Sequence, residues 1–374
     1  MAQDNKPTVK RPANKQRLAV IFGGQSREHE VSVISARSVL EYIDRDRYDI
    51  LLIGIDKQGR WLALDESHNM MAASTVESDA ARTIMVDHSQ GGAVIIRSND
   101  GGEERLGIDV AFPVLHGPRG EDGTVQGLLE LAGIATVGSS VAGSAVAMDK
   151  ELAKRAFRAE GLAQLDYMVV RRQRWRERAD TVLSEIEGRL GFPVFVKPAR
   201  LGSSVGVSRA TDKASLRAAL AEAARYDSKL IVETAATGCR EIECAVLGYA
   251  APITSVLGEI VPCSDFYDYD AKYVAQDSQF IIPAQLSEDA TAHIQEMAVA
   301  AFRAVSAAGM ARVDFFVVRE ETIFLNEINT IPGFTPISMY PKLWTASGIE
   351  YSDLIQRLIE LALERHAEHQ LDEH

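Results

Sequence analysis

At 374 residues the chain is too long for a single ordinary core, so we expect two or three domains. The net charge of −13 excludes nucleic acid as a main partner, because a phosphate backbone requires a basic surface. The three cysteines fit no zinc-binding or redox spacing, and no apolar run reaches the ~18 residues that cross a bilayer. A reducing, cytoplasmic environment without membrane contact is therefore predicted.

The first third of the chain alternates short apolar runs with helix-compatible sequence. A helix is predicted over Glu30–Ile43. Continuous apolar runs separated by helical segments are typical of a parallel sheet covered on both faces. Residues 65–105 are polar and contain several glycines, and Val94–Arg97 predicts a hairpin strand there. The predicted parallel strands are Arg17–Phe22, Tyr48–Ile55, Val110–Val114 and Ile134–Val137.

From residue 144 onward the pattern changes to mixed helices and strands. The predicted helices are Ala145–Glu160, Asp180–Leu190, Lys213–Arg225, Glu288–Ala308 and Tyr351–His366. The predicted strands are Tyr167–Arg171, Pro193–Lys197 and Leu230–Glu233, followed by a hairpin of Ala311–Val318 and Thr322–Ile328. This order indicates an α/β fold whose central and C-terminal parts are α+β.

Three domains, preceded by a tail, are predicted from these elements. Residues 1–16 are polar and lack an apolar segment, so we expect a flexible tail rather than a signal peptide. Residues 17–139 are predicted to form a domain with a Rossmann-like parallel sheet, and residues 140–232 a smaller central domain. Residues 233–374 are predicted to form the C-terminal domain, in which the polar, aromatic segment 263–280 is a candidate lid.

The predicted hairpin near the C-terminus carries the clearest chemical signal. Side chains two residues apart project from the same face of a strand, so Arg312 points with Asp314, and Glu327 with Asn329. A turn near residues 319–321 would bring both pairs onto one face. Carboxylate and amide oxygens with room for phosphate oxygens are what Mg²⁺ requires in nucleotide enzymes. The alternative is a solvated face with a surface ion pair, which the strongly apolar neighbours disfavour.

A Gly/Ser loop follows a strand that ends in Lys197. Its residues Gly202-Ser203-Ser204-Val205-Gly206 would let backbone amides and hydroxyls approach phosphate oxygens. The chain contains no Walker A motif, and an ordinary hairpin turn is the alternative for this loop. Lys150 at a helix start, Glu233 at a strand end and Glu241 beyond it are further candidates for binding a nucleotide, and each is a weak signal alone.

Several motifs are spread over the chain. They are Gly23-Gly-Gln-Ser-Arg-Glu28-His-Glu-Val-Ser, Leu115-His116-Gly with Gly120-Glu-Asp-Gly, Met148-Asp-Lys150, Val196-Lys197-Pro-Ala-Arg-Leu-Gly-Ser-Ser204-Val-Gly, Phe266-Tyr-Asp-Tyr-Asp-Ala-Lys272-Tyr273, Ala311-Arg-Val-Asp314 and Asn326-Glu-Ile-Asn-Thr-Ile-Pro-Gly333-Phe-Thr. In combination they resemble the D-alanine–D-alanine ligases of the ATP-grasp superfamily, over nearly the full chain. The resemblance implies a three-domain ATP-grasp architecture.

The resemblance also implies a nucleotide and metal site. The residues implied to contact ATP are Lys150, Lys197 and Lys272 at the phosphates, Glu233 and Glu241 at adenine and ribose, and Ser203, Ser204, Phe316 and Glu327. The implied ligands of two Mg²⁺ (or Mn²⁺) ions are Asp314, Glu327 and Asn329, with Glu327 bridging the ions.

Substrate roles are implied in the same way. The residues implied to act on the two D-alanine molecules are Glu28 at the first ammonium, His116 near its carboxylate, Arg312 and the Gly333 N–H at the oxyanion, and Ser338 at the second carboxylate. Ser203 and Tyr273 would couple to Glu28 and lock the lid over the site. The implied assembly is a homodimer.

The implied reaction activates one D-alanine as an acyl phosphate and joins it to a second, for peptidoglycan precursors. The nearest alternative is a ligase that makes D-alanyl-D-lactate, or another ATP-grasp carboxylate–amine ligase. The intact run that ends in Tyr273 favours the dipeptide over the D-lactate product. Another alternative is a regulatory module that binds nucleotide without chemistry. The presence of Arg312 and of every implied metal ligand disfavours that module. The sequence leaves open which group deprotonates the second amine, with Tyr273 and Ser203 or the substrate phosphate as options.

Overall fold

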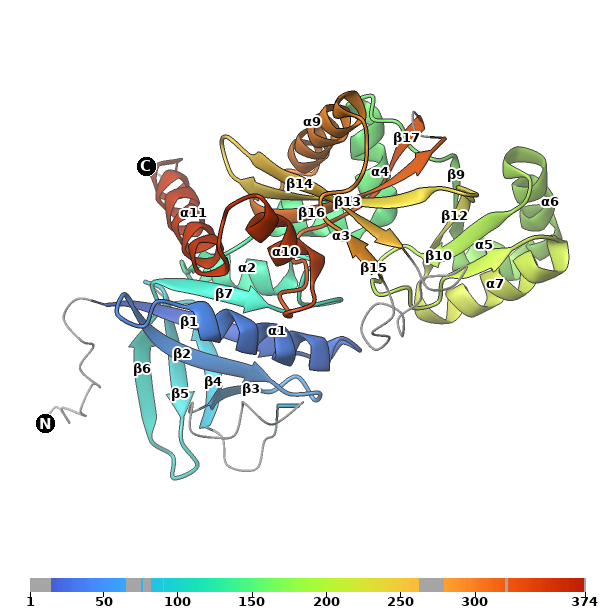
Figure 1. Cartoon of the computed structure of the whole chain (residues 1–374). Coiled ribbons are helices and arrows are strands. Elements are labelled where there is room, and N and C mark those ends of the chain that lie inside the picture. Colours follow the sequence, from blue (N-terminus) through green and yellow to red (C-terminus); the bar gives the residue numbers. More distant parts are fainter. Residues whose placement is uncertain are drawn as a thin grey trace, which may run out of the picture. The chain divides into compact units, whose positions relative to one another are not determined.

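The computed structural model describes residues 15–64, 75–76, 82–89, 91–261, 279–319 and 322–372. They form two compact units, each described by itself below (Figure 1). The first unit is the chain up to Ser140 with Gly333–Ser338 and Glu350–His374, and the second is Val141–Pro332 with Met339–Ile349. No helix in the described part is long and apolar enough to span a membrane.

Some sequence predictions fall on other residues. Most of the predicted tail and most of the predicted lid, including Lys272 and Tyr273, lie outside the described residues. The division into domains at residues 17–139, 140–232 and 233–374 remains a prediction.

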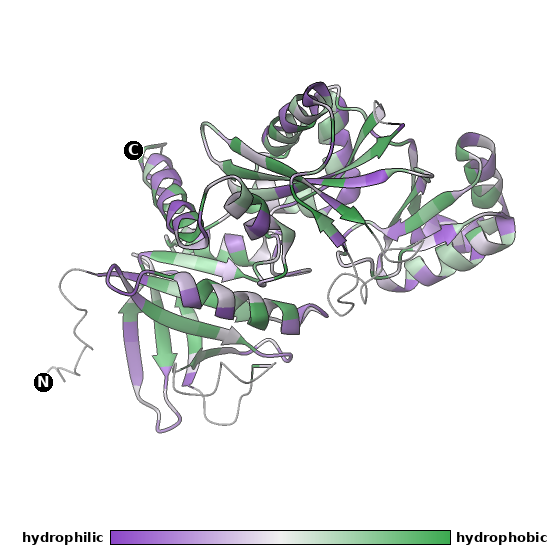
Figure 2. Ribbon diagram, in the orientation of Figure 1, coloured by the Kyte–Doolittle hydropathy of each residue, from purple (hydrophilic) through white to green (hydrophobic). Residues whose placement is uncertain are grey.

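The first unit is built on an eight-stranded sheet in the order β6-β5-β4-β3-β2-β1-β7-β8. The neighbours β2, β1, β7 and β8 are parallel, as predicted, and Figure 2 shows β1, β2 and β7 as largely hydrophobic. Strands β3 to β6 extend the sheet through antiparallel pairs. Short connections, which suit antiparallel neighbours, join β4 to β5 and β5 to β6. The strands are β1 (Gln16–Gly23), β2 (Tyr48–Ile55), β3 (Trp61–Leu64), β4 (Arg82–Asp87), β5 (Ala93–Arg97), β6 (Glu103–Gly107), β7 (Val110–Val114) and β8 (Ala135–Thr136).

The C-terminal helix belongs to the first unit. The helices of this unit are α1 (His29–Tyr42), α2 (Thr124–Leu131) and α11 (Tyr351–Asp372). At the start of α11 the Tyr351 ring stacks on Tyr42 of α1, with 4.5 Å between ring centroids. Farther along, the buried Arg365 donates a hydrogen bond of 3.0 Å to the carbonyl of Thr136 in β8. The last helix is thus fixed at both places, and it continues past the predicted end at His366.

The second unit contains two antiparallel sheets. The four-stranded sheet has the order β11-β10-β12-β9, and the five-stranded sheet has the order β15-β14-β13-β16-β17. The strands are β9 (Tyr167–Arg171), β10 (Val194–Pro198), β11 (Ser208–Ala210), β12 (Lys229–Thr234), β13 (Arg240–Gly248), β14 (Ile253–Val261), β15 (Gln279–Ile281), β16 (Gly309–Val318) and β17 (Thr322–Asn329). The helices are α3 (Val141–Met148), α4 (Lys150–Ala159), α5 (Arg172–Glu177), α6 (Ala179–Leu190), α7 (Lys213–Tyr226), α9 (Glu288–Ala304) and α10 (Met339–Ala346).

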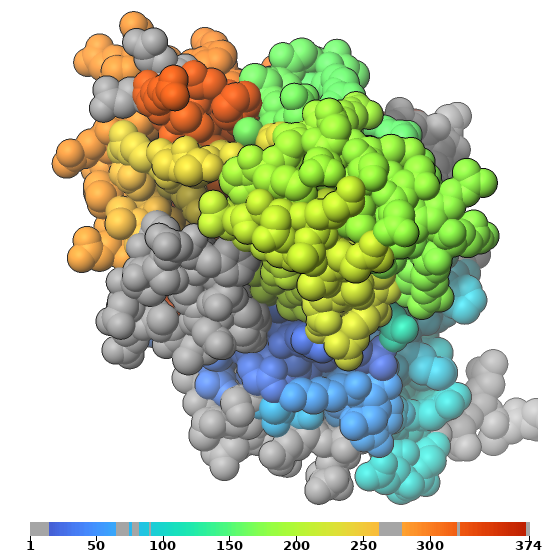
Figure 3. Space-filling view, turned by 90° about the vertical axis from the view of Figure 1, so that its right-hand side faces the viewer, coloured from blue at the N-terminus to red at the C-terminus, as the bar shows by residue number. Residues whose placement is uncertain are grey.

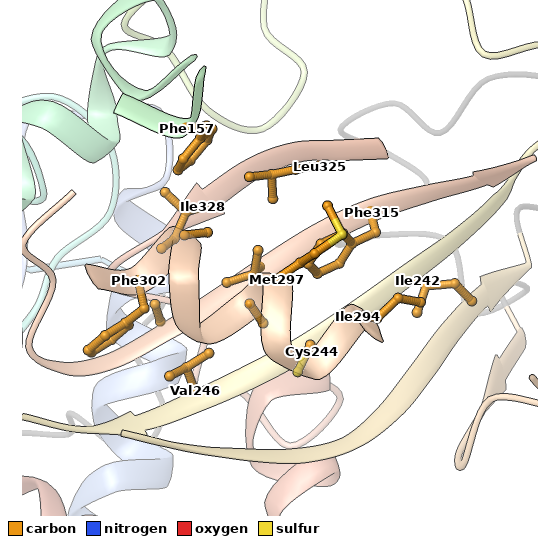
Figure 4. Close-up of a cluster of buried hydrophobic side chains, with 14 of the residues drawn as sticks. Phe157, Ile242, Cys244, Val246, Ile294, Met297, Phe302, Phe315, Leu325 and Ile328 are labelled. Carbon is orange, nitrogen blue, oxygen red and sulfur yellow. The ribbon is translucent and has the colours of Figure 1, made fainter. Parts of the chain in front are cut away.

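Helices cover one face of each of these sheets. Residues of α5, α6 and α7 form a buried cluster with β9, β10 and β12. Figure 3 shows the outer surface of this part of the chain in green and yellow-green. Figure 4 shows the corresponding cluster of the five-stranded sheet, where Phe157 of α4 and Ile294, Met297 and Phe302 of α9 pack against strand residues such as Phe315. Side chains alternate along a strand, so the residues between these buried positions point to the face of each sheet that these helices do not cover.

Two further helix predictions were wrong in their extent. The single helix predicted over 145–160 is two helices, because the Asp149 carboxylate caps α4 by accepting from the amides of Glu151 (3.1 Å) and Leu152 (3.3 Å). The break makes Lys150 the first residue of α4. The helix predicted to reach residue 308 ends at Ala304, and Ser306 beyond it has a left-handed φ of 56°.

Candidate active site

The predicted carboxylate hairpin is present. β16 pairs with β17 in antiparallel fashion, Arg312 lies opposite Asn329, and Asp314 lies opposite Glu327. Beyond Asp314 the register shifts, so that Phe315 pairs with Leu325 and Asn326 is the extra residue of a β-bulge. The bulge lets both Asn326 and Glu327 be partly exposed, whereas Ile328 and Leu325 are buried in the core.

A third carboxylate, which the sequence did not predict, continues this row. Glu243 of β13 lies opposite Asp314 of β16, on the side away from β17. Arg312 is held between the two carboxylates. Its Nε and Nη2 are each 2.7 Å from an oxygen of Asp314, and its Nε is 3.2 Å from Oε2 of Glu243. The ion pair of the alternative prediction is therefore present, between Arg312 and Asp314. It does not lie on a solvated surface, because the Arg312 side chain is only 18% exposed.

Lys150 connects this hairpin with the Gly/Ser loop. Its Nζ donates a hydrogen bond of 2.9 Å to the carbonyl of Leu201 and lies 3.4 Å from Oε2 of Glu327. Its backbone amide donates to the carbonyl of Ala199 at 2.9 Å. The capped start of α4 thus places an ammonium group between the loop and the carboxylate row.

Lys197 and Glu233 form a buried ion pair on neighbouring strands. β10 pairs with β12, and Nζ of Lys197 is 2.6 Å from Oε2 of Glu233. Lys154 of α4 completes a triad, because its Nζ is 2.5 Å from Oε1 of Glu233. The Nζ of Lys197 also lies 3.5 Å from Oδ1 of Asn326, the bulge residue of β17. The triad thereby reaches the carboxylate hairpin.

The charges of the triad change its pKa values. Burial alone would raise the pKa of Glu233, but Lys154 and Lys197 together lower it to about 2. Burial acts to lower the pKa of Lys197, and the carboxylates of Glu233 and Glu327 outweigh it, so that the pKa is raised. Glu233 and Lys197 are therefore both charged at neutral pH. Sequence reasoning missed Lys154, although its position one helical turn after Lys150 puts both lysines on one face of α4.

The Gly/Ser loop has a strained backbone. Ser203 and Ser204 have φ values of 48° and 56°, in the left-handed region that most side chains avoid. Gly206 has a φ of 71°, and a Cβ atom there would lie 2.8 Å from Cδ2 of Tyr226 and 3.0 Å from Cγ of Pro198. Strain of this kind persists where the surrounding structure enforces it, and it is concentrated at ligand-binding loops.

The oxygen atoms of the hairpin fit a magnesium site that is completed by a substrate. Among the described residues, no three His, Cys, Asp or Glu side chains converge to hold a metal by themselves. The predicted ligands supply two carboxylates, Asp314 and Glu327, and the amide of Asn329. Mg²⁺ is usually bound through one or two carboxylates together with waters and substrate phosphates, rather than by an all-protein cage. The donor set is therefore of the right kind for a metal–nucleotide complex.

The remaining predicted nucleotide residues lie on the same sheet. Glu241 of β13 is two residues before Glu243, so both project from one face, and its partner across the strands is Phe316 of β16. Phe316 is partly exposed between the buried Phe315 and Val317.

The predicted substrate residues Glu28 and His116 lie in the first unit. Glu28 precedes α1 and is buried, and its Oε2 is 2.8 Å from where a Cβ on Gly117 would stand. His116, also buried, follows β7, and its Nε2 lies 3.4 Å from Oγ of Ser35 on α1. Glycine at 117 thus lets the Glu28 carboxylate approach the backbone that follows His116.

The segment Gly333–Ser338 is fixed to the same unit. The amide of Phe334 donates to Oγ of Ser35 at 3.2 Å, and its carbonyl accepts from the Tyr351 hydroxyl at 2.6 Å. Oγ of Ser338 accepts from the amide of Thr335 at 3.0 Å and lies 2.7 Å from where a Cβ on Gly333 would stand. Ser35, which the sequence did not predict, therefore contacts both His116 and the segment that carries Gly333 and Ser338.

A Gly/Ser loop, lysines and a carboxylate hairpin supported by two antiparallel sheets define an ATP-dependent ligase of the ATP-grasp superfamily. Models of the D-ala D-ala ligase N-terminus and C-terminus match residues 17–139 and 156–360. The chain belongs to the D-alanine–D-alanine ligase family.

Relatives that match almost the full length of this chain belong to the same family. The chain is 52% identical to the D-alanine–D-alanine ligase of Ruminiclostridium cellulolyticum, over 94% of this chain and 96% of the relative. It is 49% identical to that of Heliobacterium modesticaldum, over 95% and 97%. Among solved structures, the D-alanine-D-alanine ligase from Coxiella burnetii has a TM-score of 0.84 at 40% identity, covering 96% of this chain and 97% of that chain. The VanG D-Ala:D-Ser ligase from Enterococcus faecalis has a TM-score of 0.81 at 36% identity, covering 93% and 99%.

Proposed function

We propose that this enzyme joins two D-alanine molecules through an acyl phosphate, with the residues of the carboxylate hairpin, the Lys197–Glu233 pair and the Gly/Ser loop in the roles given below. Family membership supplies the overall activity as a D-alanine–D-alanine ligase. The single observation that carries the assignment of roles is the contact of Lys150 with both Glu327 and the loop carbonyl of Leu201. This contact joins the loop and the hairpin in one site, which has a lysine for phosphate oxygens and carboxylates for metal ions. Such a site is suited to a nucleoside triphosphate.

In the first step a carboxylate oxygen of D-alanine attacks the γ-phosphorus of ATP. The bond from that phosphorus to the β,γ-bridging oxygen breaks, and ADP leaves. Phosphoryl transfer depends chiefly on alignment and on neutralising charge. Lys150 and Lys197 would contact the phosphates, and the amides and hydroxyls of Ser203 and Ser204 would add donors. Glu233 and Glu241 would contact the adenine base and the ribose.

Magnesium ions held by Asp314, Glu327 and Asn329 would supply charge neutralisation on the phosphate oxygens. Arg312 already uses both oxygens of Asp314, yet each carboxylate oxygen has a second lone pair for another partner. The protein's own part is to keep these oxygens on adjacent, hydrogen-bonded strands.

In the second step the amine of another D-alanine attacks the acyl carbon. The bond from carbon to the phosphate oxygen breaks and inorganic phosphate leaves. The proton that the amine loses would be taken up by the substrate phosphate or by Tyr273 with Ser203. Negative charge develops on the carbonyl oxygen, and preorganised donors lower the barrier. Arg312 is held in place for this role by Asp314 and Glu243. The Gly333 amide would be the second donor.

The two substrates would be recognised by residues of the first unit. The buried carboxylate of Glu28 is suited to the ammonium of the first D-alanine, and His116 to its carboxylate. The Ser338 hydroxyl would bind the carboxylate of the second D-alanine. Lys272 and Tyr273 are assigned to phosphate and to lid closure by family resemblance alone. We also propose that the enzyme acts in the cytoplasm as a homodimer and supplies peptidoglycan precursors.

The direct test is an assay of phosphate release that depends on D-alanine, with the product identified by mass spectrometry. We expect D-alanyl-D-alanine, ADP and phosphate in equal amounts. D-Lactate and D-serine should be offered in competition with D-alanine across a range of pH, because a similar structure is a D-Ala:D-Ser ligase. Preferential formation of ester or of D-alanyl-D-serine at neutral pH would overturn the assignment of the second substrate.

A further inference from the structure

Lys154 is a buried ammonium group with no place in the reaction described above. Its side chain is 3% exposed, as is that of Glu233, and the two ion-pair at 2.5 Å. Lys197 occupies the other oxygen of the same carboxylate at 2.6 Å. Two lysines therefore share one glutamate, and the triad carries one net positive charge in a buried position.

Packing alone does not explain this arrangement. Burying an ion pair costs so much desolvation that apolar residues of similar volume are often at least as stable. Lys197 by itself already neutralises Glu233. A second buried lysine on the same carboxylate therefore contributes orientation rather than neutralisation.

Tyr167 fixes the position of Lys154 from a third element. Tyr167 of β9 lies opposite Glu233 of β12, and Nζ of Lys154 is 5.4 Å from the centre of the Tyr167 ring. The guanidinium of Arg158, one turn farther along α4, lies 5.1 Å from the same ring. Lys154 is thus anchored by an aromatic face and by Glu233, and the carboxylate is pinned at both of its oxygens.

We propose that Lys154 is a positioning residue that sets the selectivity of the enzyme for adenine over guanine by fixing Glu233 as an acceptor. This rests on the proposed contact of Glu233 with the base. An ionised carboxylate has no proton to donate. Adenine presents an exocyclic amino group, which is a donor, where guanine presents a carbonyl oxygen, which is an acceptor. A carboxylate that neither rotates nor takes up a proton accepts from adenine and repels guanine.

The test compares Lys154→Met and Lys154→Arg with the wild type. The control is Lys213→Met, a change on the exposed surface of α7. KM for ATP and for GTP, kcat, and KM for D-alanine are measured, and thermal unfolding is recorded for each variant. We expect Lys154→Met to reduce the ATP/GTP ratio of kcat/KM at least about tenfold, with kcat and KM for D-alanine within threefold of the wild type. Lys154→Arg should recover much of the selectivity, and Lys213→Met should match the wild type.

Other outcomes would overturn the proposal. An unchanged ATP/GTP ratio in Lys154→Met would do so, as would an equal loss for both nucleotides. If Lys154→Met does not fold, Lys154→Gln, examined by nucleotide binding in the cold, gives the same readout.

Glu233→Gln separates the placement of Glu233 at the base from the role of Lys154. If Glu233→Gln leaves the ATP/GTP ratio unchanged, the placement of Glu233 at the base fails and the role of Lys154 fails with it. If Glu233→Gln relaxes selectivity and the neutral Lys154 variants do not, only the role of Lys154 fails.

Discussion

Asp314 and Glu327 are direct partners across neighbouring antiparallel strands, and the bulge begins immediately beyond them. The pair lies where β17 changes register, so that the face of the sheet presents Asn326 as well as Glu327. One side of the pair is bounded by Arg312 and Glu243, and the other by Lys150. Two carboxylates are thereby held beside cations without being fully neutralised by them.

Glu327→Gln should abolish most turnover and leave folding intact. The amide has nearly the same shape but lacks the charge of the proposed bridging ligand, so kcat is expected to fall by roughly a thousandfold or more. Phosphate release over a series of Mg²⁺ concentrations measures kcat and the metal requirement, and circular dichroism checks the fold. Glu296→Gln on the exposed face of α9 is the matched control. Near-normal activity of Glu327→Gln would contradict the metal assignment.

Arg312→Lys tests whether geometry matters beyond charge. Lysine keeps the positive charge but cannot form the bidentate contact that Arg312 makes with Asp314. We expect kcat to fall about a hundredfold, since loss of one oxyanion donor typically costs that much, while KM for ATP changes little. Arg303→Lys on α9 is the exposed control. A fall in ATP affinity at constant kcat would place Arg312 at the nucleotide instead.

The hairpin could be predicted because its signal is local. Alternation along Arg312, Val313 and Asp314 determines which side chains share a face, and this follows from neighbouring residues alone. The parallel core of the first sheet was equally readable, since buried parallel strands are continuous apolar runs. Asp149 is a residue type that favours helix N-caps, so the break between α3 and α4 could in principle have been predicted. The sequence on both sides is compatible with helix, and a single helix was therefore predicted.

Contacts between segments that are far apart in the chain could not be predicted from the sequence. Lys154 has the sequence context of an ordinary helix lysine, and only the fold brings Glu233 of β12 to it. Glu243 is one of several carboxylates in its region, and its importance depends on the register of β13 with β16. Ser35 accepts from the amide of Phe334 only because a segment near the C-terminus belongs to the first unit.

Gly206→Ala should destabilise the protein and weaken ATP binding. The added Cβ would lie 2.8 Å from the ring of Tyr226, on a backbone with a φ of 71°. Together these effects should lower the free energy of unfolding by about 2 kcal/mol or more. Gly188→Ala in α6 is the control, because a Cβ there meets nothing within 4 Å and alanine favours the helix. Urea unfolding and KM for ATP are the measurements, and equal stability of the two variants would refute the account of the loop.

Acid should remove the stability that Glu233 contributes. Its pKa in the folded protein is about 2, below the value of about 4.3 expected in the unfolded chain. A group with a depressed folded pKa contributes stability that is fully present above the unfolded pKa and is lost as the pH falls through the folded pKa. The difference in unfolding free energy between wild type and Glu233→Gln should therefore be constant above about pH 5 and shrink between pH 4.3 and pH 2. Urea unfolding over this range measures it, with the exposed Glu364→Gln as control. A difference that does not change with pH would mean that Lys154 and Lys197 do not hold Glu233 ionised.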